Sequence, residues 1–379
     1  MEIYLDNAAT TKPCEPAVSA CFYNMVEQYG NPSSLHSAGV KAEAAVTEAR
    51  KAIAAALVCS PECITFTSGA TESNNIIIFG AAERFGKRKK KIVISALEHP
   101  SVAAPVKHLE DMGFTVVRVK PGRSGEIDAE EFCAAVDENT FFASCMLVNN
   151  ETGAIMPVRR IFSRIKREYP DCMTHCDAVQ GFMKIPVKAS DLCADFITVS
   201  GHKVHAIKGA GAMYIKKGVR IPPHTFGGGQ EKDMRPGTES VPLIAAFGAA
   251  VRAMMPTMSS AHENAEYLSS YLIEKLNKLD YITVNSIAEN RSPYIVNFSV
   301  EGIRSEIMLH YLESRNIFVS SGSACSKGAH SSVLSAMGIS DKLADSALRV
   351  SLSRTSTKGE IDILLSAIAD GRSQLAKVK

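Results

Sequence analysis

Polar, reactive side chains follow five short apolar runs of this sequence, at the points where the runs end. The groups are residues 68–71 (SGAT), 98–99 (EH), 149–151 (NNE), 177–180 (DAVQ) and 200–203 (SGHK). In an open parallel sheet, ligands bind outside the carboxyl ends of the strands. If the apolar runs are neighbouring parallel strands, the five groups line a single pocket.

Lys203 is the least surface-like residue of the set, because it directly follows a buried-strand pattern. A partly desolvated lysine is a good nucleophile toward carbonyl groups. Asp177 also ends an apolar run and is either a helix cap or a buried carboxylate, which needs a cationic partner. His99 either caps the next helix or stacks its flat imidazole on another planar ring.

Residues 68–71 open a helical pattern. They form a good N-cap and, equally, an anion site, since a helix N-terminus exposes backbone N–H groups. An anion-binding turn, an acid for a ring nitrogen, a stacking histidine and a desolvated lysine together describe a site for pyridoxal 5'-phosphate. Proteins hold this electron sink through a lysine Schiff base and an acidic partner for the pyridinium nitrogen.

The composition and net charge of the whole chain restrict the class of protein. With 46% hydrophobic and 22% charged residues among 379, we expect a protein folded around a large core. The net charge of +2 gives no sign of a nucleic-acid or membrane surface, and no apolar run is expected to span a bilayer. The first residues do not resemble a signal peptide, so we expect a cytoplasmic protein with reduced thiols.

Two groups among the ten cysteines call for comment. Cys172 and Cys176 flank His175, but three potential ligands in a strand-like run favour a structural interpretation over a metal site. Cys325 lies in SSGSACSKGAH at 320–330, where only small and polar residues surround it. Free cysteines are usually buried as small hydrophobes, so this one needs another explanation.

Helical and strand patterns alternate from about residue 40 to 215, which predicts an α/β fold with a mostly parallel sheet covered on both faces. Expected strands are 63–69, 91–96, 115–120, 141–150, 172–177, 195–200 and 211–215, and expected helices are 38–57, 70–85, 101–112 and 158–168.

The polar, glycine-rich stretch 226–240 predicts a loop, and after it the pattern of helices and strands changes. Beyond it, helices are expected at 238–255, 261–279, 304–316 and from about 359, and strands at 294–300, 317–321 and 347–353. This part is a smaller α+β unit. We place the boundary near Pro256, so that 16–256 form a large cofactor domain and 1–15 with 257–379 form a small domain.

Nine motifs occur in one order along nearly the whole chain. They are YLDNAAT, TSGATESNN, EHPSV, NNETG, DAVQ, SGHK, FGGGQEKDMRPGTES, SSGSACS and RVSLSR. As a set they strongly resemble the cysteine desulfurases of the NifS/IscS type, which are class-V aminotransferases of PLP-dependent fold type I. The resemblance implies that fold, L-cysteine as substrate and a homodimer.

The roles of the family carry over onto the matching positions. Lys203 would hold the cofactor and move the substrate Cα proton, while Asp177 would pair with the pyridinium nitrogen and Gln180 with the phenolate oxygen. His99 would stack on the ring and assist proton transfer. The residues that would hold the phosphate are Ala70, Thr71, Ser200 and His202, together with Thr238, which would reach the phosphate of the second subunit. Asn150 would contact both cofactor and substrate, and Arg349 would bind the substrate carboxylate.

Cys325 would be the nucleophile that takes sulfur from L-cysteine as a persulfide, leaving L-alanine. A protein acceptor, either an iron–sulfur scaffold or a tRNA-thiolation protein, would then collect the sulfur. The stretch after Cys325 is shorter than in the housekeeping iron–sulfur members, which puts the acceptor in doubt. In addition, Ala206 and Ile207 stand where the family commonly has Gly-Pro, and Ser353 stands where glycine is usual.

Other functions of the same fold were weighed against this one. An aminotransferase would not need Cys325 in a polar stretch, whereas a selenocysteine lyase stays open, since the two substrates differ only in the chalcogen. A sulfur-transfer scaffold without catalysis would not need Lys203, Asp177 and His99 together.

Overall fold

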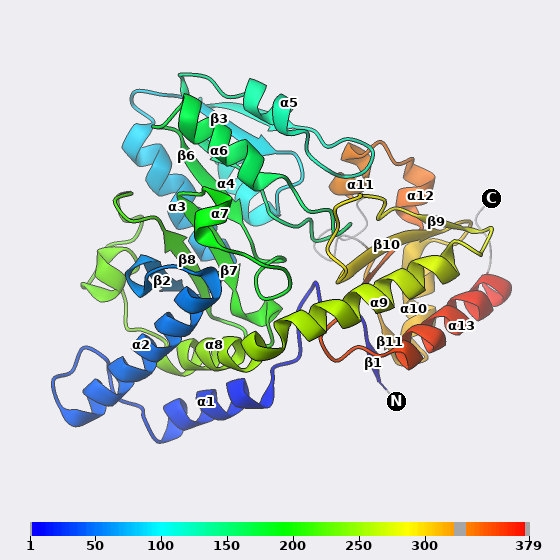
Figure 1. Cartoon of the computed structure of the whole chain (residues 1–379), viewed down its shortest axis with the longest axis horizontal. Helices are drawn as coiled ribbons and strands as arrows, with labels where there is room; N and C mark the ends of the chain where they lie inside the picture. Colours follow the sequence, from blue (N-terminus) through cyan, green and yellow to red (C-terminus); the bar gives the residue numbers. More distant parts are fainter. Residues whose placement is uncertain (1, 322–330, 376–379) are drawn as a thin grey trace.

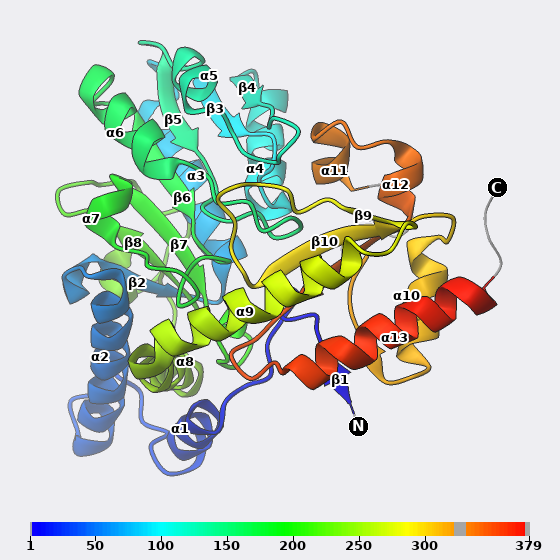
Figure 2. The ribbon, with the colours of Figure 1, turned by 45° about the vertical axis from the view of Figure 1, so that its right-hand side comes forward.

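A computed structural model describes residues 2–321 and 331–375, and Cys325 lies outside these residues. The described strands form three sheets (Figures 1 and 2). The largest has seven strands, in the order β2 (Ile64–Thr67), β8 (Gly211–Ile215), β7 (Phe196–Ser200), β6 (Met173–Asp177), β5 (Thr140–Ser144), β3 (Lys91–Ser95) and β4 (Thr115–Val119). Neighbouring strands are parallel except around β8, which is antiparallel to β2 and β7.

Helices cover both faces of this sheet. They are α2 (Ser37–Leu57), α3 (Ala70–Phe85), α4 (Pro100–Asp111), α5 (Ala129–Ala134), α6 (Val158–Glu168), α7 (Ala189–Leu192) and α8 (Val241–Met254). Alternate strand residues point to opposite faces. Ile92 and Ile94 of β3 join the apolar cluster of α3 and α4, whereas Val93 joins the cluster that holds α5 and α6. The expected α/β fold with a two-sided sheet is thus confirmed.

The strand expected at 141–150 ends at Ser144. The cause is Glu98, whose Oε1 accepts a hydrogen bond from the Met146 backbone N–H at 2.7 Å. The Met146 N–H therefore takes no part in the hydrogen bonds between strands, although the N–H groups of Cys145 and Leu147 still donate to β6 carbonyls. The residues from Asn149 onward consequently follow an irregular segment rather than the strand itself.

A smaller part contains the other two sheets. The order β12 (Ala347–Ser351), β10 (Ile295–Val300) and β9 (Ile282–Val284) is antiparallel, and β1 (Ile3–Tyr4) pairs in parallel with β11 (Ile317–Phe318). The helices here are α9 (Met258–Leu276), α10 (Ser305–Glu313), α11 (Ser332–Ala336), α12 (Asp341–Asp345) and α13 (Lys358–Gln374). Ile3 and Leu5 share one apolar cluster with α9, β10 and α13. We keep the division at residue 256 as a proposal.

Several short elements were not expected from the sequence, namely α1 (Glu15–Val26), α5, α7, α11, α12, β1 and β9. Helix α1 buries only Ala17 and Asn24, so its larger apolar side chains do not face the core of this chain. The other six are short, which leaves too few residues for a periodic pattern.

The two helices expected around Pro256 are present as α8 and α9. The stretch Val241–Leu276 is long and apolar enough, by length and composition alone, to cross a membrane. The α-helix is interrupted near Pro256, because this residue lies in the 3-10 turn Met255–Thr257 that joins α8 to α9. Within the protein, 56% of its most apolar window is buried, and α8 packs against α1 and α2.

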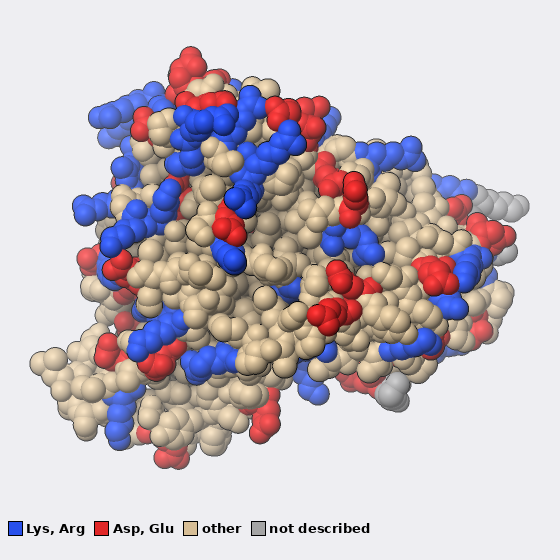
Figure 3. Space-filling view, viewed as in Figure 1, with Lys and Arg blue, Asp and Glu red and all other residues tan. Residues whose placement is uncertain are grey.

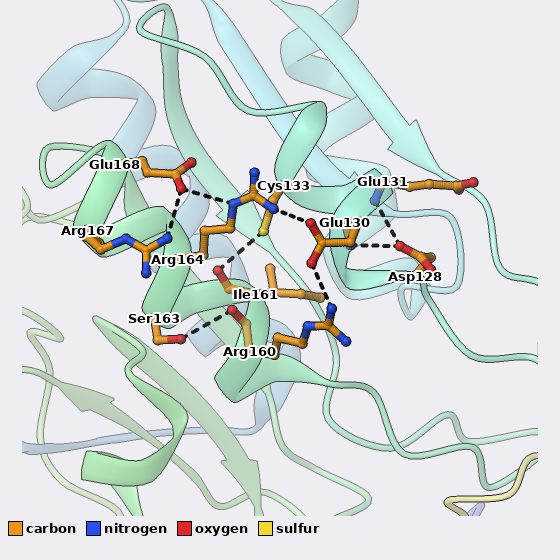
Figure 4. Close-up of polar contacts among 10 residues, drawn as sticks. All are labelled: Asp128, Glu130, Glu131, Cys133, Arg160, Ile161, Ser163, Arg164, Arg167 and Glu168. Atoms are coloured by element: carbon orange, nitrogen blue, oxygen red, sulfur yellow. Dashed lines mark hydrogen bonds and ion pairs between the residues drawn. The ribbon is translucent and has the colours of Figure 1, made fainter.

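Ion pairs tie α5 to α6 at the surface (Figure 4). Glu130 accepts from Arg160 at 2.8 Å and from Arg164 at 2.5 Å, and Arg164 also reaches Glu168 at 3.0 Å. These groups are largely exposed, so solvent screening leaves each pair only a small contribution to stability. Both helices also contribute residues to the large apolar cluster.

Candidate active site

The groups expected to line one pocket lie at one edge of the large sheet. Strands β3, β6 and β7 are parallel and end at Ser95, Asp177 and Ser200. His99 and Lys203 follow two of these ends closely, and the charges of both act on Asp177. The structure therefore brings together the three residues to which the sequence assigned chemistry.

Asp177 is a buried carboxylate held by donors. Its Oδ1 accepts from the Val179 backbone N–H at 3.1 Å and its Oδ2 from Asn74 Nδ2 at 3.1 Å. Burial raises the pKa of Asp177, and these hydrogen bonds together with the charges of His99 and Lys203 act in the opposite direction. A carboxylate so placed is ready to hold a cation or a protonated ring nitrogen.

His99 begins α4 and is oriented by Ser101. Its Nδ1 lies 2.8 Å from Ser101 Oγ and accepts from the Ser101 backbone N–H at 3.1 Å. Ser101 Oγ in turn accepts from Asn74 Nδ2 at 2.8 Å, so it is the hydroxyl proton that points to the ring. Nδ1 is thus an acceptor, and a neutral His99 carries its proton on Nε2. Burial lowers the pKa of His99, with Lys203 adding to this and Asp177 opposing it.

Lys203 ends the 3-10 turn Gly201–Lys203 that follows β7. Its Nζ donates to the carbonyl of Ala8 at 2.7 Å and to that of Ala9 at 2.6 Å. Thr11 secures the same segment, since its N–H and Oγ1 both donate to the His202 carbonyl. The N-terminal stretch is therefore a wall of the site. The sequence analysis quoted this stretch as a motif but assigned it no role.

The turn after Lys203 contains one of the departures from the family pattern. Ala206 is buried, and its N–H donates to the Gly201 carbonyl at 3.1 Å. His205, just before it, has a φ of 57°. The loop beside Lys203 therefore closes on itself without the usual Gly-Pro.

Gln180 lies in the turns that follow β6 and is 5% exposed. Its Nε2 donates to the Ala8 carbonyl at 2.8 Å, the same acceptor that Lys203 Nζ uses. Its Oε1 accepts from Lys184 Nζ at 2.8 Å. The amide of Gln180 and the amine of Lys203 thus meet at one carbonyl.

The start of α3 is open for an anion. Its N-cap, Gly69, supplies no side-chain hydrogen bond, and a Cβ added to Gly69 would meet no atom within 4 Å. Gly211 approaches so closely that its own Cβ would lie 2.6 Å from Gly69 Cα. The first N–H groups of a helix of this length attract negative charge. The expected phosphate ligands Ala70, Thr71, Ser200 and His202 belong to this turn and to the end of β7.

His202 faces the N-terminal stretch, because its Nδ1 lies 3.2 Å from Thr10 Oγ1. Burial, together with Lys203 and two further lysines, lowers the pKa of His202 to about 4. The imidazole is therefore neutral at physiological pH. It can serve an anion as a hydrogen-bond donor but not as a charge.

Arg349 is buried on β12, and its guanidinium reaches two parts of the site. Nη1 donates to the Asn150 carbonyl at 3.0 Å and Nη2 to Asp6 Oδ1 at 2.8 Å. Its Nε is buried and lacks a hydrogen-bond partner among residues 2–321 and 331–375. Asn150 and Arg349 are therefore neighbours, as expected, while Asp6 was not expected.

Thr238 lies on the surface, in the polar loop 226–240. Arg235 of this loop pairs with Glu72 in the first turn of α3 at 3.0 Å. The loop is thereby tied to the helix whose N-terminus forms the anion site. Cys325, the expected nucleophile, lies outside the described residues.

Sequence reasoning missed Asn74, Ser101, Lys184 and Asp6 as parts of the site. Asn74 and Ser101 lie inside helical patterns, where a polar residue is usually predicted to be solvent-exposed. Both are buried, so only the folded chain shows that they connect Asp177 to His99. Asp6, Asn74 and Ser101 all fall inside motifs quoted above, and this was the one available signal.

Comparison with known proteins agrees with this geometry. The family described as Aminotransferase class-V matches residues 3–364. The chain belongs to the class-V aminotransferase family. A relative named Cysteine desulfurase IscS, from Dictyoglomus turgidum, is 37% identical over 370 residues, covering 97% of this chain and 93% of the relative. The expected membership of the NifS/IscS group is confirmed.

Solved structures of similar proteins superpose closely on the chain. One described as a NifS-like protein has a TM-score of 0.94 at 36% identity and covers 99% of this chain and 100% of its own. Another, described as SspA in complex with cysteine, has a TM-score of 0.83 at 32% identity, with 94% and 100% covered. The expected fold type is thereby confirmed.

Proposed function

We propose that the chain is a pyridoxal 5'-phosphate-dependent cysteine desulfurase, which converts L-cysteine to L-alanine and passes the sulfur to Cys325. The observation that carries the proposal is the cluster of buried Asp177 with half-buried His99 and Lys203 beside the open N-terminus of α3. The names of the relatives and the structure described with bound cysteine support it.

The residues fit this cofactor. When bound, the cofactor supplies an electron sink that weakens the bonds at the substrate Cα and Cβ. Asp177 would hold a proton at the ring nitrogen, the N–H groups at the start of α3 would bind the phosphate, and Gln180 Nε2 would donate to the phenolic oxygen. Lys203 Nζ would hold the cofactor covalently and carry the Cα proton, with His99 covering the ring.

The substrate carboxylate is expected to bind at Arg349. Two of its N–H groups contact Asn150 and Asp6, and its buried Nε has no partner within residues 2–321 and 331–375. Because hydrogen bonds hold the guanidinium on two sides, its orientation is fixed for binding a planar anion such as a carboxylate. Asn150 would line the same pocket, because its carbonyl receives one of these hydrogen bonds.

Cys325 is our proposed sulfur acceptor, and the residues on either side of its stretch are tied to the site. The backbones of Ser320 and Arg349 exchange two hydrogen bonds, of 2.6 and 3.1 Å. Ser331 Oγ donates to Glu151 Oε2 at 2.5 Å. A thiolate at Cys325 would attack the substrate sulfur; the S–S bond forms as the C–S bond breaks, and its electron pair stays on the carbon that becomes the methyl group of L-alanine after protonation.

Product analysis tests the function. The protein loaded with cofactor should form L-alanine from L-cysteine, with equal sulfur recovered as persulfide or sulfide. Lys203→Ala should abolish L-alanine formation, while the exposed control Lys208→Ala should not. Cys325→Ala should still bind L-cysteine but leave no persulfide, whereas Cys193→Ala should retain it. Pyruvate or an amino-group transfer product in place of L-alanine would refute the proposal.

The same assay with L-selenocysteine addresses the alternative substrate. If selenide forms from it while L-cysteine gives no L-alanine, the protein is a selenocysteine lyase instead. The persulfide acceptor is proposed to be a protein of iron–sulfur cluster assembly or tRNA thiolation, in the cytoplasm. Crosslinking through Cys325 followed by mass spectrometry identifies it, and recovery of neither class would contradict this part.

We further propose a homodimer in which Thr238 reaches the phosphate of the second subunit. Support comes from an exposed apolar surface, defined here as the α1 face, which continues into the following loops. Its members are Val18, Phe22, Tyr23, Met25, Val26, Tyr29, Leu35 and Val40. Contiguous exposed apolar residues mark interaction surfaces. The lower left of Figure 3, over α1 and α2, is mostly without charge.

A further inference from the structure

Lys184 is a buried lysine that the proposed reaction does not use. It follows Gln180 in the turns after β6, and only 6% of it is exposed. Lysine is almost never fully buried unless it is paired. No carboxylate within residues 2–321 and 331–375 forms an ion pair with it. Its one hydrogen bond to a side chain goes to Gln180 Oε1, at 2.8 Å.

The contacts of Gln180 determine which way its amide faces. The ammonium of Lys184 can only donate, so the amide atom beside it is the oxygen. The carbonyl of Ala8 can only accept, so the atom beside it, at 2.8 Å, is the nitrogen. Two partners of opposite and fixed character thus hold one amide in one orientation.

This orientation directs the amide N–H₂ toward the proposed cofactor. Lys203 Nζ donates to the same Ala8 carbonyl at 2.7 Å. Gln180 Nε2 therefore lies on the side where Lys203 would hold the cofactor. One of its two N–H bonds goes to Ala8, which leaves the other to donate to the phenolic oxygen.

The surroundings explain why this contact depends on Lys184. Burial, reinforced by the charges of Lys203 and Arg349, lowers the pKa of Lys184 to about 7. The Lys184 carbonyl accepts from His262 Nδ1 at 3.0 Å, which fixes the turn from outside. Side chains of Thr11, Tyr294 and Arg354 line a cavity of about 20 Å³ beside it, room for roughly one water molecule.

We propose that Lys184 is a positioning residue: its Nζ donates a hydrogen bond that holds the Gln180 oxygen, so that the amide nitrogen faces the phenolic oxygen of the cofactor. The inference rests on the proposed function, because it needs the cofactor at Lys203. Without the Lys184 contact, the Gln180 amide can rotate and present its oxygen to the phenolate, which repels it.

The test is a pH titration of the absorption band of bound pyridoxal 5'-phosphate, with its dissociation constant measured in parallel. Lys184→Met should still bind the cofactor, but with the apparent pKa of the band shifted upward by about one unit or more. Gln180→Ala should give a shift of similar size, and the double variant should add little. The exposed control Lys188→Met should titrate as the natural protein does.

The outcomes separate this inference from the proposed function. A band in Lys184→Met that titrates like the natural protein overturns the inference, as does additivity in the double variant. If the natural protein itself binds no cofactor, the proposed function fails first. If Lys184→Met does not fold, Lys184→Gln, which keeps a donor of smaller reach, replaces it in the cycle with Gln180→Ala.

Discussion

At the scale of single residues, hydrogen bonds in the site determine which atoms carry protons. Asn74 Nδ2 donates both to Asp177 and to Ser101 Oγ. Because that hydroxyl already accepts a proton from Asn74, its own proton goes to His99 Nδ1. One amide thus holds the carboxylate ionised and the imidazole in one tautomer. Its own Oδ1 is buried without a partner among the described residues.

The first prediction concerns Ser101→Ala. Loss of the hydroxyl removes one donor to His99 Nδ1, which weakens the preference for the neutral ring and raises the pKa of His99. We expect the acid limb of the L-alanine-forming activity to move to higher pH, and the rate to fall roughly fivefold, since such a hydrogen bond contributes about 1 kcal/mol. Ser101→Thr should restore both. An unchanged pH profile for Ser101→Ala would contradict the assignment.

Glu98 is the second group whose proton matters. Burial, reinforced by Asp177, raises its pKa to about 8, although Ser95 and the Met146 N–H act against the shift. Its folded pKa thus exceeds the ordinary value of 4.5. The folded state binds the extra proton between these two values, so stability decreases as pH rises from about 4.5 to 8.

The second prediction is therefore that Glu98→Gln flattens this dependence. At pH 5 the variant and the natural protein should unfold at similar denaturant concentrations. Toward pH 8 the variant should become the more stable, by up to roughly 1.4 kcal/mol for each pH unit between the two pKa values. Equilibrium unfolding at several pH values checks this, with exposed Glu83→Gln as control. A difference that does not change with pH would show that Glu98 is ionised throughout.

Residue identity alone revealed the catalytic candidates but not their supports. Lys203, Asp177 and His99 could be predicted because each follows a recognisable strand and carries a reactive group. Lys184 could not, because a lysine in a short turn reads as solvent-exposed. Its burial depends on α9 and the N-terminal stretch, which come from distant parts of the chain.

At the scale of elements, the strands of the large sheet were predictable because their residues are apolar on both faces. Element ends were less so. β5 ends early because the Glu98 carboxyl group accepts a hydrogen bond from the Met146 N–H, and nothing in the local sequence indicates this. Short helices such as α11 depend on a cap and on tertiary packing, since so few residues are marginal alone.

The third prediction tests how α11 anchors the stretch that precedes it. Ser331 Oγ accepts from the Leu334 N–H at 3.1 Å as an N-cap and donates to the buried Glu151. Ser331→Ala should cost about 1–2 kcal/mol in unfolding free energy. It should also slow persulfide formation while the absorption of the bound cofactor stays unchanged.

Chemical denaturation and a single-turnover assay measure the two effects of Ser331→Ala. The neighbouring exposed Ser332→Ala is the matched control, because it keeps both hydrogen bonds of Ser331. If Ser331→Ala loses stability but forms persulfide at the natural rate, the anchor has no role in sulfur transfer.

At the scale of the whole molecule, chain segments far apart in sequence close the site. Residues 4–11 contact the β7 turn, β12 and Gln180, so that the first strand and the last share one cluster. Figure 2 shows α9 lying across the small sheet, with β1 near α13 at the lower edge of the view. Such long-range pairing could be expected from the family resemblance, but no residue pattern specifies it.

The last prediction concerns the α1 face. Phe22 and Tyr29 are 60% and 81% exposed, so a monomer would leave them in water, whereas a dimer would cover them. Phe22→Glu with Tyr29→Glu should convert a dimer into a monomer in analytical ultracentrifugation, with the dissociation constant raised at least 100-fold. Because Thr238 is proposed to complete the phosphate site of the partner, the monomer should bind pyridoxal 5'-phosphate more weakly. The matched control Tyr267→Glu, also on an exposed apolar residue, should stay dimeric. A monomeric natural protein with full cofactor affinity would refute both the interface and the role of Thr238.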